Sequence, residues 1–257
     1  MKIEIESQHK SSYDHKVVIC DKKMVFKFFP EVISKTGFEP KDYNLVMVKP
    51  NLCGLYHPQL RLIELVLSFF ETYAQKIVIG ETDSMSHTPE VQFRTLGILD
   101  MVKQFDKVKA INLMEDKILD LEVPSAHVIN NLPIPNLVHH CDLLVNIPKV
   151  GTHMRTMLTC AIKNLFGLLA EKHKYSAYHS IGVDQVLADL MKIVRCDLNV
   201  ADVRNKVILG VDPLTVDILA CKFVGLDPLN VEYLRLVSAD RNLKLEKVVN
   251  QLQIIKM

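Results

Sequence analysis

The 257-residue sequence has no hydrophobic run long enough to cross a bilayer. Its first ten residues, MKIEIESQHK, lack the hydrophobic core of a signal peptide. We therefore expect a cytoplasmic protein without a membrane partner. The chain also lacks a strong charge of either sign, with 31 basic and 30 acidic residues and a pI near 7.7. This balance argues against a nucleic-acid partner, because nucleic-acid binders usually have a strongly basic domain.

Several motifs of well-known functional sites are absent as well. The six cysteines are scattered, with no C-x-x-C pair and no ferredoxin spacing, so buried free thiols are the simplest interpretation. An iron-sulfur cluster assembled from distant cysteines remains the alternative. Neither G-x-G-x-x-G nor Walker A occurs, which argues against a conventional NAD or ATP site. Without a G-x-S-x-G motif, Asp83, Ser84 and His87 give little support to an acyl-transfer triad.

Strand-like and helix-like apolar patterns alternate along the chain. This alternation predicts an α/β fold with a mostly parallel sheet and helices on both faces, doubly wound in the Rossmann-like manner. We expect a single α/β domain over residues 1–257. The predicted strands are 2–6, 16–20, 44–48, 77–79, 143–147, 198–201 and 207–209, and the predicted helices include 22–29, 59–73, 156–169 and 213–224, with 131–136 as a connection.

Polar residues directly follow four of the predicted strands. In parallel α/β sheets, ligands bind outside the carboxyl ends of the strands. We therefore expect one crevice to gather these groups. They are Lys49 with Asn51, Glu81 with Asp83 and Ser84, Lys149 with Thr152 and His153, and Asp202.

The segment 142–179 has the most informative pattern. The apolar run 156–169 is too long for most strands, and we expect it to form a buried helix. On such a helix Thr156 and Lys163 would share one face, with His153 about one turn earlier. Residues 145–179 contain five lysines and arginines and a single acid. This local excess of positive charge predicts a small anionic ligand.

Lys163 is the most informative single residue. An ammonium group within so apolar a run must reach solvent, pair with an anion, or have its pKa lowered by desolvation. A lowered pKa would make the amine nucleophilic. The alternative is a lysine whose stem is buried while its ammonium group reaches water. His153 and His179 could likewise be surface or capping residues rather than functional ones.

Five motifs together resemble those of the domain of unknown function 362 family. The resemblance covers about residues 44–235, which is most of the chain, and the family has no settled activity. Many members of that family carry ferredoxin-type cysteine motifs, which this sequence lacks. The motifs are VKPNLCG at 48–54, IGETDS at 79–84, NIPKVGTH at 146–153, TCAIKNLFG at 159–167 and DPLTVDILACKFVGLDP at 212–228.

The order and spacing of His153, Lys163 and His179 are similar to a pattern in the catalytic domain of the lactate racemase family. In that family the lysine is covalently linked to a nickel pincer nucleotide, the later histidine binds the nickel, and the earlier histidine is an acid/base. The resemblance therefore implies that Lys163 holds the cofactor, His179 binds nickel and His153 transfers protons. His87 resembles the partner acid/base.

Three functional hypotheses follow. The first is an isomerase- or oxidoreductase-like enzyme that transfers a proton or hydride on a small anionic substrate, with Lys149 and Asn51 contacting the anion. The second is a non-catalytic module that binds phosphate or a nucleotide at a helix N-terminus through Lys149, Thr152, Thr156 and Lys163. The third, electron transfer through an iron-sulfur cluster, has the least support because the cysteines are dispersed.

Overall fold

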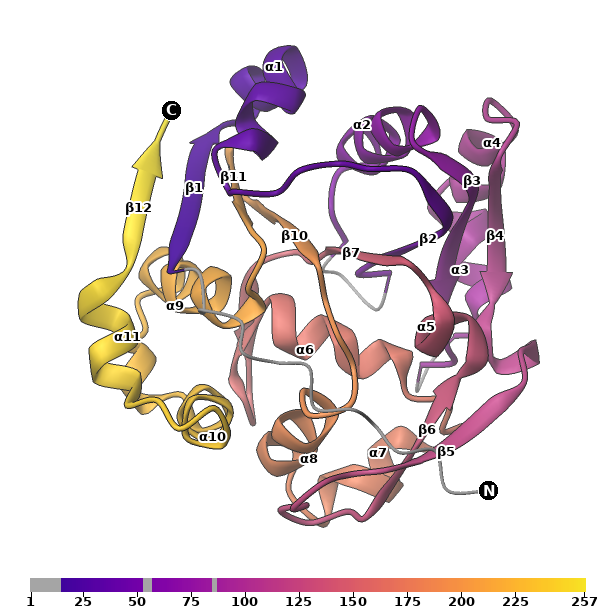
Figure 1. The fold of residues 1–257 in the computed structure, drawn as a ribbon. Helices are drawn as coiled ribbons and strands as arrows, with labels where there is room; N and C mark the ends of the chain where they lie inside the picture. Colours follow the sequence, from indigo (N-terminus) through magenta and orange to yellow (C-terminus); the bar gives the residue numbers. More distant parts are fainter. Residues whose placement is uncertain (1–14, 53–56, 85–86) are drawn as a thin grey trace.

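The computed structural model describes residues 15–52, 57–84 and 87–257 (Figure 1). Within these ranges an eight-stranded sheet has the order β12-β1-β11-β10-β7-β2-β3-β4. Its strands are β1 (Lys16–Asp21), β2 (Tyr43–Pro50), β3 (Ala74–Glu81), β4 (Val108–Asn112), β7 (Leu143–Ile147), β10 (Leu198–Val203), β11 (Lys206–Gly210) and β12 (Gln253–Lys256). Two hairpins form separate small sheets, β5 (Ile118–Glu122) with β6 (Asn131–Pro135), and β8 (Gly151–His153) with β9 (Met157–Thr159).

The large sheet is mostly parallel. Strand β11 is antiparallel to both of its neighbours, β1 and β10, and the other five pairings in this sheet are parallel. Strands β2, β3, β7 and β10 are buried nearly throughout. Continuous apolar runs of this kind form the strands of a sheet that is covered on both faces.

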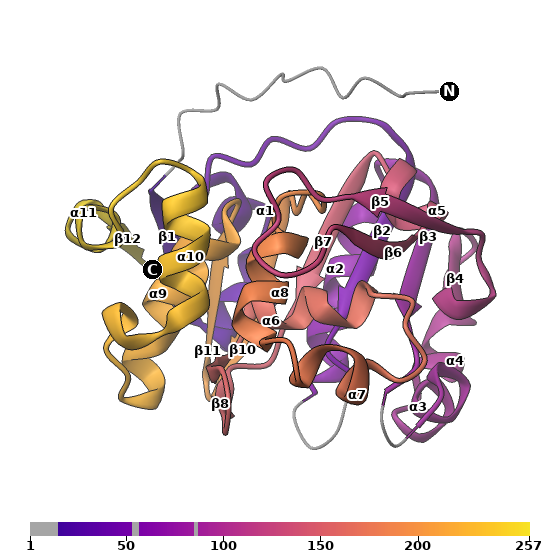
Figure 2. The same cartoon turned by 90° about the horizontal axis from the view of Figure 1, so that it is seen from below.

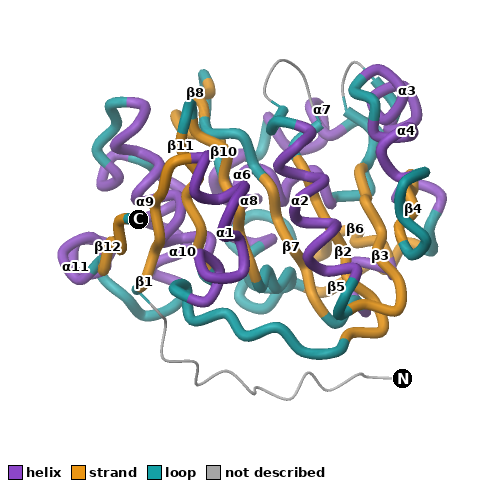
Figure 3. The backbone as a smooth tube through the Cα atoms, turned by 90° about the horizontal axis from the view of Figure 1, so that it is seen from above, coloured by secondary structure: helices purple, strands orange, loops and turns teal. Residues whose placement is uncertain are grey.

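Helices cover both faces of the sheet, which confirms the predicted α/β fold. Along each strand, alternate side chains point to opposite faces, so that Val46 and Val48 join one core and Met47 joins the other. The first core lies beneath α1 (Lys22–Ser34), α2 (Leu60–Glu71), α3 (Pro89–Thr95) and α4 (Ile98–Val102) (Figure 3). The second lies beneath α5 (Asn136–His140), α6 (Ala161–Leu165), α7 (Lys174–His179), α8 (Val183–Leu190), α9 (Pro213–Val224), α10 (Glu232–Asp240) and α11 (Leu245–Gln251) (Figure 2).

Three short 3₁₀ turns complete the described secondary structure: η1 (Leu113–Glu115), η2 (Phe166–Leu168) and η3 (Pro228–Asn230). Among the described residues, no helix is both long and apolar enough to span a bilayer. The predicted strand 2–6 lies outside the described residues.

Two predictions about local structure are wrong. The run 156–169 is not one helix, because 157–159 pairs antiparallel with 151–153 as a hairpin and α6 begins only at Ala161. Met157 has a φ of 61°, which a continuous helix cannot contain. The segment 131–136 is not a simple connection, because β6 pairs antiparallel with β5. Both hairpins pack apolar side chains into the second core, and local periodicity does not distinguish such segments from buried helices.

Candidate functional site

The β8–β9 hairpin fixes the position and orientation of the His153 ring. His153 lies directly opposite Met157 in the hairpin register. Its Nδ1 accepts hydrogen bonds from the backbone N–H groups of Arg155 and Thr156, each at 3.3 Å. The Thr156 hydroxyl oxygen lies 3.2 Å from the same nitrogen and donates to the Leu158 carbonyl at 3.1 Å. The turn between the two strands thus closes around one edge of the imidazole.

The fold brings His153, Lys163 and His179 within electrostatic range of one another. Burial lowers the pKa of His153, and the charges of Lys163, His179 and Arg155 lower it further. The pKa of His179 is likewise lowered by burial and then by Arg155 and Lys163. The groups come from the hairpin, from α6 and from α7, so three elements build one cationic cluster, which we define as His153, Arg155, Lys163 and His179.

Lys163 lies on α6 with its ammonium group 4.2 Å from the centre of the Phe166 ring. A cation over an aromatic face is stabilised by the negative electrostatic potential of the ring. The Phe166 ring in turn packs edge-on against Tyr178 of α7, with centroids 5.6 Å apart. This contact joins the element that carries Lys163 to the element that carries His179.

His179 is held by its ring rather than by hydrogen bonds. The ring stacks on Tyr175 with a centroid distance of 4.1 Å and an interplanar angle of 29°. Its Nδ1 is buried and has no hydrogen-bond partner among the described residues. A buried polar atom without a partner is costly, and a bound water, an ion or a catalytic role often explains it. The Nδ1 atom of His153 thus accepts hydrogen bonds from the chain, whereas the Nδ1 atom of His179 has no such partner among the described residues.

The first two backbone N–H groups of α6 are used by a carboxylate of the chain itself. The buried carboxylate of Asp217 accepts the backbone N–H groups of Ala161 at 2.6 Å and Ile162 at 3.1 Å. The Tyr233 hydroxyl donates to the same carboxylate at 3.0 Å. Burial raises the pKa of Asp217 to about 6, against the opposing effect of these hydrogen bonds. Two backbone N–H groups at the start of α6, which have no partner within the helix, thus find one in Asp217.

A buried polar network supports α6 from the sheet. The Lys49 ammonium donates to a Glu81 carboxylate oxygen at 2.8 Å, and both side chains are almost fully buried. Asn164 donates to the Lys49 carbonyl at 3.0 Å and to the Asn146 side chain at 2.7 Å. A Cβ atom on Gly167 would lie 2.8 Å from both Glu81 Oε1 and Lys49 Cε. The backbone after α6 therefore packs directly on the ion pair.

A second set of contacts attaches α7 to the end of β3. Lys174 donates to the Thr82 hydroxyl and, at 2.7 Å, to the Asp83 carbonyl. The Thr82 hydroxyl donates to the Gly167 carbonyl at 2.7 Å. Polar residues at the carboxyl ends of β2 and β3, together with Thr82 directly after β3, are thus used to position α6 and α7, which carry Lys163 and His179.

The other predicted site residues are placed differently. The Lys149 ammonium pairs with the buried Asp202 carboxylate at 2.8 Å, and Thr152 is exposed on β8. Asn51 is buried, and its backbone N–H donates to the Ile147 carbonyl at 3.0 Å. His87 is exposed, and its backbone N–H and carbonyl bond to Ser84 of the same loop. The roles proposed for these four residues stay predictions.

The described residues contain no group of three or more histidine, cysteine or acidic side chains arranged to hold a metal ion. The five described cysteines are free thiols. Burial raises the pKa of each one, most strongly for Cys160 and Cys196. These described thiols therefore give no support to an iron-sulfur site.

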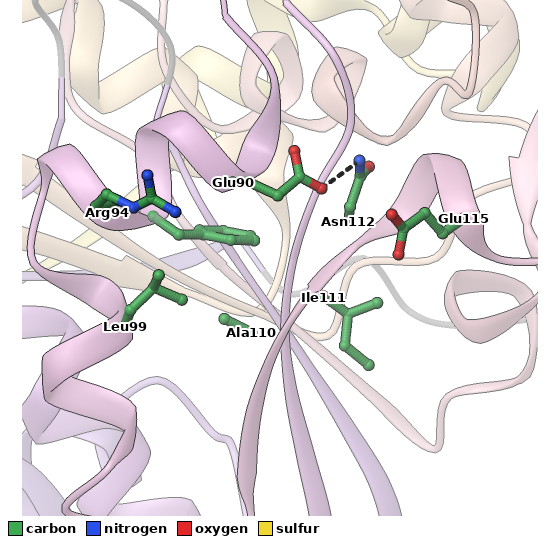
Figure 4. Close-up of a pocket in the computed structure, with 8 residues that line it drawn as sticks. Glu90, Arg94, Leu99, Ala110, Ile111, Asn112 and Glu115 are labelled. Carbon is green, nitrogen blue, oxygen red and sulfur yellow. Dashed lines mark hydrogen bonds between the residues drawn. The ribbon is translucent and has the colours of Figure 1, made fainter.

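Two surface cavities lie away from the cationic cluster. The larger, of about 310 Å³, lies beside β4 and is lined by Phe93, Ile111 and the hydrogen-bonded pair Glu90 and Asn112, among others (Figure 4). The smaller, of about 250 Å³, lies between α1 and α2. None of the predicted site residues lines either cavity.

Sequence reasoning did not assign Arg155, Tyr175 or Asp217 to the site. Arg155 was visible only as part of the local excess of basic residues. The stacking of Tyr175 on His179 and the contact of Asp217 with the N-terminus of α6 arise from tertiary structure. The sequence contains no local signal for either contact.

Comparison with protein families identifies the chain. Residues 46–206 match the family model described as a domain of unknown function, DUF362. The chain belongs to this family. The match includes β2, β3, β7 and β10 together with His153, Lys163 and His179, so the cationic cluster lies within the DUF362 region. No curated protein matches the chain at a significant level.

One solved structure similar to this DUF362 chain is the lactate racemase apoprotein from Thermoanaerobacterium thermosaccharolyticum. The TM-score is 0.49, with 13% sequence identity, and the match covers 80% of this chain. It covers 56% of the racemase chain, so this chain corresponds to little more than half of that protein.

Proposed function

We propose that this DUF362 protein binds a small anion, a phosphate or a carboxylate, between the β8–β9 hairpin, α6 and α7. The observation that carries the proposal is the cationic cluster: the charges that act on His153 and His179 all come from basic groups. Arg155 and Lys163 carry the positive charge of the cluster, and both act on the two histidines. A small anion from outside the chain would be attracted by these charges.

Binding of inorganic phosphate and of acetate, measured by calorimetry and by the shift in melting temperature, tests this proposal. Lys163→Met should weaken binding about tenfold, because it removes a charge-assisted contact. Lys172→Met, which removes an exposed lysine before α7, is the matched control and should bind like the wild type. Absence of binding by the wild type, or equal binding by both variants, would contradict the proposal.

A second candidate is an isomerase-like proton or hydride transfer on an anionic substrate with a nickel pincer nucleotide. It is favoured by the convergence of His153, Lys163 and His179, in the order that the lactate racemase resemblance implies. These residues fit the group: Lys163 would hold it covalently, and His179, with an unpartnered ring nitrogen, would supply the metal ligand. The bound cofactor would supply the hydride chemistry.

Intact-mass and nickel analysis of protein from its native cells test the second candidate. Lys163→Arg separates the two functions, because arginine keeps the positive charge and cannot form the same covalent link. We expect this variant to bind phosphate but to have neither the added mass nor the nickel. A wild-type protein of unmodified mass that still binds phosphate would reject the cofactor and leave anion binding in place.

A further inference from the structure

One ring nitrogen of His153 has its protonation state fixed by the backbone. The N–H groups of Arg155 and Thr156 both point at Nδ1, at 3.3 Å. A nitrogen that accepts from two amide hydrogens must carry a lone pair, since a hydrogen on the same atom would oppose both donors. The Thr156 hydroxyl oxygen lies 3.2 Å from Nδ1 and 3.1 Å from the Leu158 carbonyl oxygen, and its hydrogen can rotate to either acceptor. The two backbone N–H groups, whose directions are fixed by the peptide planes, therefore decide the assignment.

The hydrogen of the neutral ring must then be on the other nitrogen, Nε2. Taking up a second proton would require protonation of Nδ1, because Nε2 already carries hydrogen. Protonated Nδ1 would lose both backbone hydrogen bonds and open the turn between β8 and β9. The turn geometry thus opposes the charged form of His153.

The neighbouring elements oppose the charged form as well. The groups that act on His153 are Arg155 of the hairpin, Lys163 of α6 and His179 of α7, all of them basic. A positive charge on His153 would be repelled by each of them. The backbone hydrogen bonds and the surrounding charges therefore favour the same state of the ring.

We propose that His153 acts at the anion site as a fixed, neutral hydrogen-bond donor through Nε2, and not as a proton acceptor. The inference rests on the proposed function and deepens it, because it specifies the ligand group that meets this residue: an oxygen with a free lone pair, as in a phosphate, a carboxylate or a polarised carbonyl. Neutral imidazoles held in this way can polarise a substrate oxygen. Any proton acceptor in this site is then a residue other than His153.

The tautomer can be measured directly. Two-bond ¹H–¹⁵N correlation spectra of uniformly labelled wild-type protein distinguish Nδ1–H, Nε2–H and doubly protonated rings, and the His153→Asn spectrum assigns the signal. We expect the Nε2–H form at neutral pH. An Nδ1–H form or an imidazolium would overturn the inference, whether or not any ligand binds.

Two variants test the roles of the two ring nitrogens separately. In His153→Asn the side-chain oxygen takes the place of Nδ1 and the donor at Nε2 is lost. In His153→Gln the side-chain amide reaches the place of Nε2 and the acceptor for the turn is lost. We expect the Asn variant to keep the wild-type melting temperature and to bind inorganic phosphate about tenfold more weakly. The Gln variant should bind within about threefold of the wild type.

The outcomes separate this inference from the proposed function. Wild-type affinity in a folded Asn variant would show that Nε2 makes no contact with the ligand and would overturn the donor role. If the wild type binds neither phosphate nor acetate, the proposed function fails, while the spectra still decide the tautomer of His153.

Discussion

At the scale of single residues, Asp217 illustrates how one buried carboxylate organises the start of α6. It is fully buried and accepts two backbone N–H groups and the Tyr233 hydroxyl. These donors compensate only part of the cost of burying a negative charge, so the pKa of Asp217 is raised to about 6. The charge state of this residue therefore links the stability of the fold to pH.

The sign of this linkage follows from the direction in which the pKa moves. A carboxyl with a raised pKa in the folded protein contributes most to stability below its ordinary value of 3.8, and this contribution is lost as the pH rises through about 6. Urea unfolding of wild type and Asp217→Asn from pH 4 to pH 7 should show a stability difference that changes across this window, because the asparagine does not titrate. A difference that stays constant would contradict the account.

The sequence predicted part of the site and could not predict the rest. The grouping of His153, Lys163 and His179 was implied by the resemblance of their order and spacing to the lactate racemase pattern. Arg155 was recognisable only as one of several basic residues. Lys149 was predicted to contact an anion, but its ammonium pairs with Asp202, 53 positions away in the chain. Pairing partners at such separation cannot be read from local sequence.

At the scale of elements, the position of α6 depends on close packing behind it. Gly167 follows the helix within η2, and a Cβ atom there would lie 2.8 Å from Lys49 Cε and 2.8 Å from Glu81 Oε1. We expect Gly167→Ala to destabilise the protein by about 1–3 kcal/mol, because the buried ion pair must move to make room. Unfolding in urea measures this cost.

A double-mutant cycle provides the control. In a Lys49→Ala, Glu81→Ala background the two long side chains that meet the new methyl group are gone, so Gly167→Ala should cost clearly less than in the wild type. An equal cost in both backgrounds would mean that the ion pair does not restrict this position.

The element that the sequence predicted incorrectly, 156–169, shows the limit of periodicity. Leu158, Ala161, Ile162 and Leu165 are all fully buried, as a helical run would require. Instead, 157–159 pairs with 151–153 as a hairpin, and the Asp217 carboxylate accepts the N–H group of Ala161, the first residue of α6. Both determinants are tertiary contacts. The buried apolar positions of a hairpin cannot be told from those of a buried helix by composition alone.

At the scale of the whole molecule, the predicted α/β architecture is confirmed, since strand-like runs form one mostly parallel sheet and helix-like runs cover both of its faces. The two antiparallel pairings of β11 were not predicted. Strand β11 follows β10 after a two-residue turn in which Arg204 has a φ of 51°. This turn reverses the chain direction in a region where periodicity alone indicates only two strands.

Asp202 connects distant parts of the molecule. Its carboxylate pairs with Lys22 at the start of α1 and with Lys149 after β7, each at 2.8 Å, and accepts the Gln59 N–H at the start of α2. Asp202→Asn leaves two lysines without their counter-charge and should cost about 3–5 kcal/mol of unfolding free energy. Asp21→Asn, which breaks the exposed pair with Lys206, is the control and should cost less than about 1 kcal/mol. Equal losses of unfolding free energy in the two variants would contradict the claim that the buried Asp202 pairs stabilise the fold more than the exposed Asp21 pair.

The central claim is that His153, Lys163 and His179 share one site, and histidine titration by NMR tests it most directly. The positive charge of Lys163 lowers the pKa of His179 and of His153, so Lys163→Met should raise both. Lys172→Met should leave both unchanged. If the two histidines titrate in Lys163→Met as they do in the wild type, the three residues do not share a site.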